Sequence, residues 1–175
     1  MLPFSLTPDL VTGIPAIDEQ HGELFDIANE VVLASDEKLH PALFDLALTF
    51  LIEYTSYHFA AEEIVMARVE YPGHAQHADG HTRLREEVLS ILSRVRQQGP
   101  SQQSKHEVVR LLEDWVVRHV READRDFAHF VRERSIDVRT LSLPTIESLK
   151  DSGALAMDFD ERFAHGVAAL RSCCR

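Results

Sequence analysis

Cysteine is almost absent from this chain of 175 residues, and so are long hydrophobic runs. The only two cysteines, Cys173 and Cys174, are adjacent and nearly terminal, so they cannot form a disulfide that stabilises a core. A membrane-spanning helix needs about 20 consecutive apolar residues, and no run approaches that length. The N-terminal residues lack a basic region followed by an apolar one, which predicts that no secretory signal is present. These absences favour a cytoplasmic, soluble protein.

Basic residues are also scarce, because 18 lysines and arginines stand against 29 acidic residues and leave a formal net charge of −11. Such a charge repels phosphate backbones and anionic lipid, so nucleic acids and membrane surfaces are poor candidate partners. The chain does contain apolar and charged residues in the proportions of a globular protein, 45% and 27%. Its length predicts one domain with a possible extension.

Apolar residues recur at the three- and four-residue spacing of amphipathic helices over four stretches of the chain. The predicted helices cover residues 17–33, 41–70, 74–98 and 105–133. Proline, glycine and polar residues separate them, and no stretch alternates convincingly with a period of two. Helices joined by short loops favour antiparallel neighbours, so we predict an all-α, up-down-up-down antiparallel four-helix bundle.

The bundle is expected to occupy residues 17–134, after an irregular N-terminal arm at 1–16. A C-terminal extension at 135–175 is predicted to begin as a linker and to end in a short amphipathic helix. The apolar face of that helix, within residues 158–172, could dock on its own bundle, mediate self-association or contact an unknown partner. Docking or pairing with a second copy is the favoured interpretation.

Polar side chains on the inner faces of the predicted helices are not explained by an apolar core. His58 and Glu62 are four residues apart, as are His77 and His81, so each pair projects from one face of its helix. A single inward histidine is more often a hydrogen-bonded core residue than a metal ligand. Two such pairs on consecutive helices favour a shared site.

Position along the bundle predicts that further polar side chains lie at the same level. His21 is early in the first predicted helix, whereas His119 and Asp124 are late in the fourth. In an antiparallel bundle, the starts of the first and third helices share one end with the finishes of the second and fourth. The side chains expected to converge are His21, His58, Glu62, His77, His81, His119 and Asp124.

Imidazoles and carboxylates gathered in an apolar interior predict a metal site, because such nitrogen and oxygen ligands suit first-row transition metals. The set is too large for one tetrahedral ion, which takes four ligands. Two octahedral ions offer about twelve positions, and the imidazoles, two bridging carboxylates and one solvent-derived bridge fill all but one. A redox-active metal pair with one open position is suited to binding a small diatomic molecule.

Four motifs carry these residues, and together they resemble the motifs of the hemerythrins, most closely the bacteriohemerythrins. In chain order they are IDEQHGELF, HFAAEEIVM, YPGHAQHADGH and WVVRHVREAD. The resemblance covers roughly residues 10–133. It implies a non-haem cofactor of two iron ions (Fe2+/Fe3+) with a bridging oxo or hydroxo group, and dioxygen as the ligand.

The resemblance also implies how the histidines divide between the irons. One iron would be bound by His77, His81 and His119. The other would be bound by His21 and His58 and would carry the open position.

Further residues take implied roles from the same resemblance. Glu62 and Asp124 would bridge the two irons, while Trp115 and Val116 match family positions that line the oxygen pocket. The chain departs from the family at Leu6, near where its members usually have a tryptophan, and we interpret this as a packing change. The residues after the bundle are also not part of the common pattern.

Glu122, three residues after His119, lies at the edge of the helix stripe, and we interpret it as a solvated charge. Turned inward, it would instead cap the open iron and suppress oxygen binding. The other histidines have no partner at ligand spacing and are interpreted as surface or loop residues: His40, His74, His106, His129 and His165.

The leading functional hypothesis is reversible dioxygen binding for storage, delivery or buffering, by an oxygen-binding protein rather than an enzyme, with at most weak peroxidase-type activity. One alternative is an oxygen or redox sensor that signals through residues 135–175. Another is a di-iron enzyme acting on peroxide or nitric oxide, although the twice-repeated Glu-x-x-His motif of ferritin-like enzymes is not found. A bundle with paired core histidines and no metal is the remaining alternative.

Overall fold

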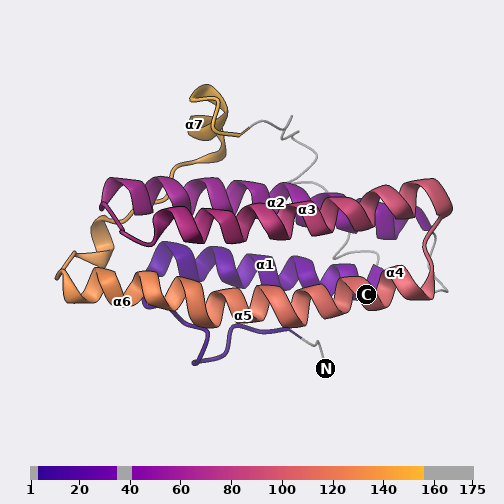
Figure 1. Ribbon diagram of the computed structural model, residues 1–175, viewed down its shortest axis with the longest axis horizontal. Coiled ribbons are helices and arrows are strands. Elements are labelled where there is room, and N and C mark those ends of the chain that lie inside the picture. Colours follow the sequence, from indigo (N-terminus) through magenta and orange to yellow (C-terminus); the bar gives the residue numbers. More distant parts are fainter. Residues whose placement is uncertain (1–3, 35–40, 156–175) are drawn as a thin grey trace.

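The computed structural model describes residues 4–34 and 41–155, and within these ranges the chain forms helices and no strands. Three long helices are α1 (Pro15–Ala34), α2 (Pro41–Arg68) and α3 (His74–Gln98). A fourth rod runs without interruption from Gln102 to Glu133 (Figure 1). Its turns are, in order, α4 (Gln102–Leu111), η1 (Leu112–Val116), α5 (Val117–His119), η2 (Val120–Asp124) and α6 (Arg125–Glu133).

The four rods form a bundle in which each rod contacts two others. Helix α2 packs between α1 and α3, and α4 packs between α3 and α1. Consecutive rods run in opposite directions along the long axis (Figure 1). The predicted all-helical bundle is therefore confirmed, and the starts of α1 and α3 share one end with the finishes of α2 and α6.

The helix boundaries follow from local chemistry that the sequence shows. The Asp18 side chain accepts hydrogen bonds from the backbone N–H groups of Thr12 (2.7 Å) and Gly13 (3.0 Å) around the start of α1. At the start of α4, Ser101 and Ser104 form a capping box, in which each hydroxyl accepts from the backbone N–H of the other residue. These contacts satisfy backbone donors that a helix start leaves without partners.

Residues 4–14 are irregular, and they are tied to the bundle. Phe4, Leu10 and Ile14 are buried among the helices. The buried Asn29 side chain on α1 pairs with both backbone groups of Phe4, accepting from its N–H at 3.0 Å and donating to its C=O at 2.8 Å. The arm is thus held by apolar burial and by two hydrogen bonds to one side chain.

Replacing Asn29 by alanine is expected to destabilise the fold by about 1–3 kcal/mol, because two buried backbone groups of Phe4 lose their partners. Urea denaturation followed by circular dichroism measures this change. Gln97→Ala, which removes an exposed amide on α3, is the control and should leave the midpoint unchanged. An equal midpoint for Asn29→Ala and the unsubstituted chain would contradict the proposed anchoring.

The stretch predicted as a linker contains two helical turns, η3 (Val138–Thr140) and α7 (Ile146–Asp151). Helix α7 lies against α2 on the outside of the bundle (Figure 1). Leu141 and Leu149 are both buried, which explains why this segment folds onto the bundle. The predicted amphipathic helix and self-association face at 158–172 lie outside the described residues.

No helix in the described ranges has the length and apolar character needed to cross a membrane.

Candidate metal centre

All seven side chains predicted to converge lie together at one end of the bundle, in two adjoining groups that share Glu62. Within each group, one potential ligand atom per residue lies within 4.8 Å of the others. The larger group contains Glu62, His77, His81, His119 and Asp124. The smaller group contains His21, His58 and Glu62.

Three imidazoles of the larger group turn the same nitrogen toward one another. The Nε2 atom of His77 lies 3.1 Å from that of His81 and 3.0 Å from that of His119, and the Nε2 atoms of His81 and His119 are 3.0 Å apart. A metal–nitrogen bond of about 2.1 Å would place two ligands at a right angle about 3.0 Å apart. The triangle therefore fits three neighbouring corners of an octahedral ion.

The carboxylates complete this half of the site. Asp124 Oδ1 lies 3.2 Å from His77 Nε2 and 3.0 Å from His119 Nε2. Glu62 Oε2 lies 3.3 Å from His77 Nε2 and 3.5 Å from His81 Nε2. Each carboxylate oxygen is thus adjacent to two of the three imidazoles, as ligands around one centre would be.

The smaller group has two imidazoles instead of three. Asp124 Oδ2 lies 3.1 Å from His21 Nε2, and Glu62 Oε2 lies 4.0 Å from His58 Nε2. The two imidazole rings are 5.0 Å apart between centroids. Both carboxylates therefore reach from the larger group to the smaller one, and the two halves differ by one histidine.

Several polar atoms of this seven-residue cluster, called the cage below, are close to one another without being hydrogen-bonded. Both ring nitrogens of His21 and all four carboxylate oxygens of Glu62 and Asp124 are buried and make no contact of hydrogen-bond geometry with a described residue. Burying a carboxylate is costly unless its oxygens are fully bonded, because the anion loses its hydration. Potential ligand atoms that converge on common centres fit a bound cation, so the cluster is able to bind metal.

The electrostatics of the cage indicate the same demand for positive charge. Burial raises the pKa of Asp124, but the charge of His119 and contacts with His21 and His77 outweigh it and hold the pKa well below its usual range. Burial lowers the pKa of His77, yet the contacts with Asp124 and Glu62 outweigh it and raise the pKa to about 10. These directions keep the carboxylates ionised and favour a positive charge at the centre of the cage.

The fourth rod places His119 and Asp124 on the same face by a local change of helix type. On an α-helix, residues five apart point about 140° away from each other, since each residue turns the chain by about 100°. Residues Val120–Asp124 instead form a π-helical turn, η2, whose hydrogen bonds join residues five apart. This turn brings Asp124 into line with His119, and such turns are frequent at functional sites.

Three residues that support the cage were not identified from the sequence. Gln20 Oε1 lies 2.8 Å from His58 Nδ1, and Glu63 Oε1 lies 2.8 Å from His81 Nδ1. The Phe59 ring stacks on the His81 imidazole with centroids 3.8 Å apart. Acceptors at Nδ1 leave Nε2 free to bind a metal, as partners of metal-binding histidines do. Their place in the sequence could have indicated Gln20 and Glu63, because each is the direct neighbour of a predicted ligand.

The two predicted pocket residues are adjacent on the fourth rod. Val116 is buried in the main apolar cluster. The Trp115 backbone belongs to η1, and its side chain is outside the described part of the structure.

An open cavity of about 480 Å³ reaches the three-histidine half from solvent. Its lining includes His77 and His119, whose side chains are 3% and 10% exposed, whereas those of the other five cage residues are at most 1% exposed. Glu122 also lines this cavity and is exposed, rather than turned toward His21 and His58.

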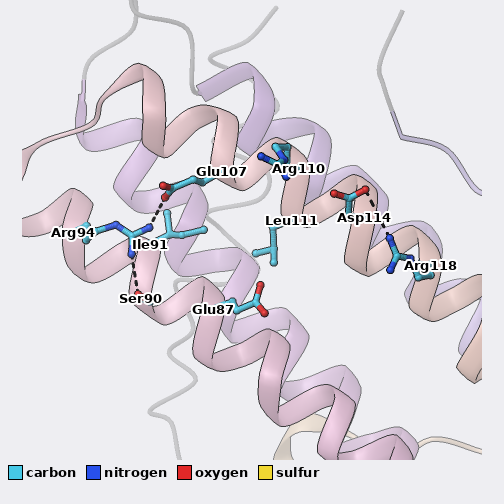
Figure 2. A pocket seen from close by; sticks show the side chains of 9 residues that line it. All are labelled: Glu87, Ser90, Ile91, Arg94, Glu107, Arg110, Leu111, Asp114 and Arg118. Atoms are coloured by element: carbon cyan, nitrogen blue, oxygen red, sulfur yellow. Dashed lines mark hydrogen bonds and ion pairs between the residues drawn. The ribbon is translucent and has the colours of Figure 1, made fainter.

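A neighbouring cavity of about 510 Å³ lies between α3 and the fourth rod (Figure 2). Ile91 and Leu111 line it together with charged side chains, and Arg94 pairs with Glu107 across it (Figure 2). It contains no side chain of the histidine cage. The cage itself is therefore the feature of the described residues that carries metal chemistry.

A helical bundle with a histidine-rich cage at one end defines a class of metal-binding protein, and comparisons with known proteins identify which one. Residues 12–131 match the family model described as the Hemerythrin HHE cation binding domain. The chain is 32% identical over 126 residues to a bacteriohemerythrin of Pseudomonas aeruginosa, covering 71% of this chain and 78% of that protein. This chain belongs to the hemerythrin family.

More distant relatives are consistent with this membership. A bacteriohemerythrin of Clostridium acetobutylicum is 26% identical over 120 residues, which are 66% of this chain and 91% of that protein. A hemerythrin-like protein of Naegleria gruberi is 24% identical over 125 residues, which are 71% and 91% of the two chains. The family match ends at residue 131, so η3 and α7 lie outside it.

Proposed function

We propose that this chain is a non-haem di-iron protein that binds dioxygen reversibly, for storage, delivery or buffering, without being an enzyme. One observation carries the proposal: the cage has three imidazoles in one half and two in the other, with both carboxylates shared. A metal in the smaller half would have one ligand fewer from the protein. That position is where a small molecule would bind.

The geometry supports a specific division of the ligands between two irons. His77, His81 and His119 would hold one iron, and His21 and His58 would hold the other. The carboxylates that lie between the halves, Glu62 and Asp124, would bridge the pair. When bound, the two ferrous ions would supply the two electrons that reversible dioxygen binding of this kind uses.

The protein's own contribution is to orient the metal-binding imidazoles and to keep water out of the site. The side chains of His21 and His58 are at most 1% exposed, so the smaller half is dry. His58 donates its Nδ1 proton to Gln20 Oε1, which directs its Nε2 lone pair into the cage. A dry pocket with fixed ligands favours binding of a neutral diatomic over hydrolysis or proton leakage.

Oxygen uptake by the ferrous protein distinguishes binding from catalysis. Protein loaded anaerobically with Fe2+ is expected to hold two irons per chain, take up one dioxygen per iron pair and release it under argon. The zinc-loaded protein is the control and should take up none, because zinc has no redox chemistry. Continuous oxygen consumption in the presence of a reductant would contradict a binding role and support the enzyme alternative.

A sensor is the second candidate function, and the position of the extension favours it. Helix α7 packs against α2, the helix that carries His58 and Glu62. Limited proteolysis of the diferrous and diferric forms tests this candidate. Different cleavage rates within residues 135–155 would favour sensing, and equal rates would remove it.

A further inference from the structure

The extension beyond the family domain packs behind the turn of α2 that carries two predicted ligands. Leu149 of α7 and Ala61 of α2 are both fully buried in one apolar cluster. Ala61 immediately precedes Glu62, and the cluster also includes Tyr57, which immediately precedes His58. Helix α7 therefore covers the outer side of the ligand-bearing turn (Figure 1).

A series of polar contacts leads from this extension to the cage. The Tyr57 hydroxyl donates to the Pro144 carbonyl oxygen at 3.4 Å. The Gln20 side chain is in polar contact with Tyr57, and Gln20 Oε1 accepts from His58 Nδ1 at 2.8 Å. His58 donates to the Gln20 oxygen and Tyr57 donates to the extension. The Gln20 N–H groups and the Tyr57 hydroxyl oxygen are then the donor and the acceptor that remain available to each other.

This series of contacts ends at His58, in the half of the cage that has fewer ligands. In the other half, His81 has its own acceptor, Glu63. In the two-histidine half, neither nitrogen of His21 has a hydrogen bond to a described residue. Within the described ranges, the Gln20 contact is therefore the hydrogen bond at Nδ1 that orients an imidazole in this half, while Asp124 lies on the Nε2 side of His21.

We propose that Tyr57 is a positioning residue through which the extension at 136–155 holds His58 in its metal-binding orientation. The extension thereby sets the affinity of the two-histidine half, while the three-histidine half is independent of it. This inference rests on the proposed metal site, and it adds a role for residues outside the family domain.

Tyr57→Phe in the full chain, titrated with Zn2+ against a chelating indicator, tests the proposal. Partners that orient metal-binding histidines directly contribute about 10- to 100-fold in metal affinity, so an indirect partner is expected to contribute roughly 3- to 10-fold. The variant should therefore weaken the second zinc step by that factor and leave the first step unchanged. Tyr71→Phe is the control, because it removes a hydroxyl from a half-buried tyrosine that is not part of this series of contacts. It should change neither step.

Leu149→Asp is a second test of the proposal. A charged side chain cannot stay in the buried cluster, so the extension should detach from α2. It is expected to weaken the same zinc step as Tyr57→Phe does. If the extension acts through Tyr57, the double variant should be no weaker than the stronger single variant. In the zinc form, the His58 Nδ1 proton resonance should also exchange with solvent faster in each variant.

The possible results separate this inference from the proposed function. Equal weakening of both zinc steps would indicate a general loss of stability and would overturn the positioning role. No change in either step would overturn it too, as would additive effects in the double variant. An unsubstituted chain that binds no metal would overturn the proposed function, and this inference with it.

Discussion

Replacement of His77 by alanine is expected to abolish metal binding in the three-histidine half and to lower the melting temperature of the iron-loaded protein by roughly 8–16 °C. His77 Nε2 lies within 3.3 Å of both carboxylates and within 3.1 Å of two imidazoles. A ligand present at a thousand times its dissociation constant stabilises a fold by about 4 kcal/mol. Each kcal/mol shifts the melting temperature of a chain of this size by about 2–4 °C.

The matched control is His74→Ala, because His74 is on the same helix and lies outside both ligand groups. It should retain two irons per chain and the melting temperature of the unsubstituted protein. Metal analysis and differential scanning calorimetry measure both properties. Full iron content and an unchanged melting temperature in His77→Ala would contradict the assignment of His77 as a ligand.

Glu62→Gln is expected to have the second large effect, because Glu62 belongs to both halves of the cage. Its Oε2 atom lies 3.3 Å from His77 Nε2, 3.5 Å from His81 Nε2 and 4.0 Å from His58 Nε2. Glutamine has the same size but no negative charge, so it cannot balance two cations. The variant should bind no iron, whereas His58→Ala should retain the iron of the three-histidine half.

Glu63→Gln is the control for this pair, since Glu63 is the next residue and accepts from His81 Nδ1 outside the cage. The glutamine oxygen can still accept that proton, so iron binding should be preserved. Metal content per chain after gel filtration distinguishes the three variants. If Glu62→Gln and His58→Ala each keep one iron, Glu62 serves one half only and the bridging role is wrong.

The helices and the convergence of the cage could be predicted because both depend on short-range patterns. The period of apolar residues gave α3 its observed bounds, His74–Gln98. Antiparallel order then placed His21 and His119 at the same level as the pairs on α2 and α3. Neither step required knowledge of how any side chain packs.

The structure added what depends on tertiary context. The π-helical turn η2 aligns Asp124 with His119, and no local propensity in Val120–Asp124 distinguishes it from an α-helix. The supports at Gln20 and Glu63 could not be predicted, because glutamine and glutamate at helix surfaces are usually solvated. Helix α7 was hidden for a related reason: its few apolar residues indicate a surface only once the matching face of α2 is known.

Optical titration of the anaerobically reduced, iron-loaded protein with dioxygen tests the central claim most directly. We predict a visible absorption band that grows to saturation at one dioxygen per iron pair, disappears when oxygen is removed and returns when it is readmitted. Irreversible conversion to the diferric form within the mixing time, with no band that oxygen removal reverses, would contradict the claim that this chain binds dioxygen reversibly.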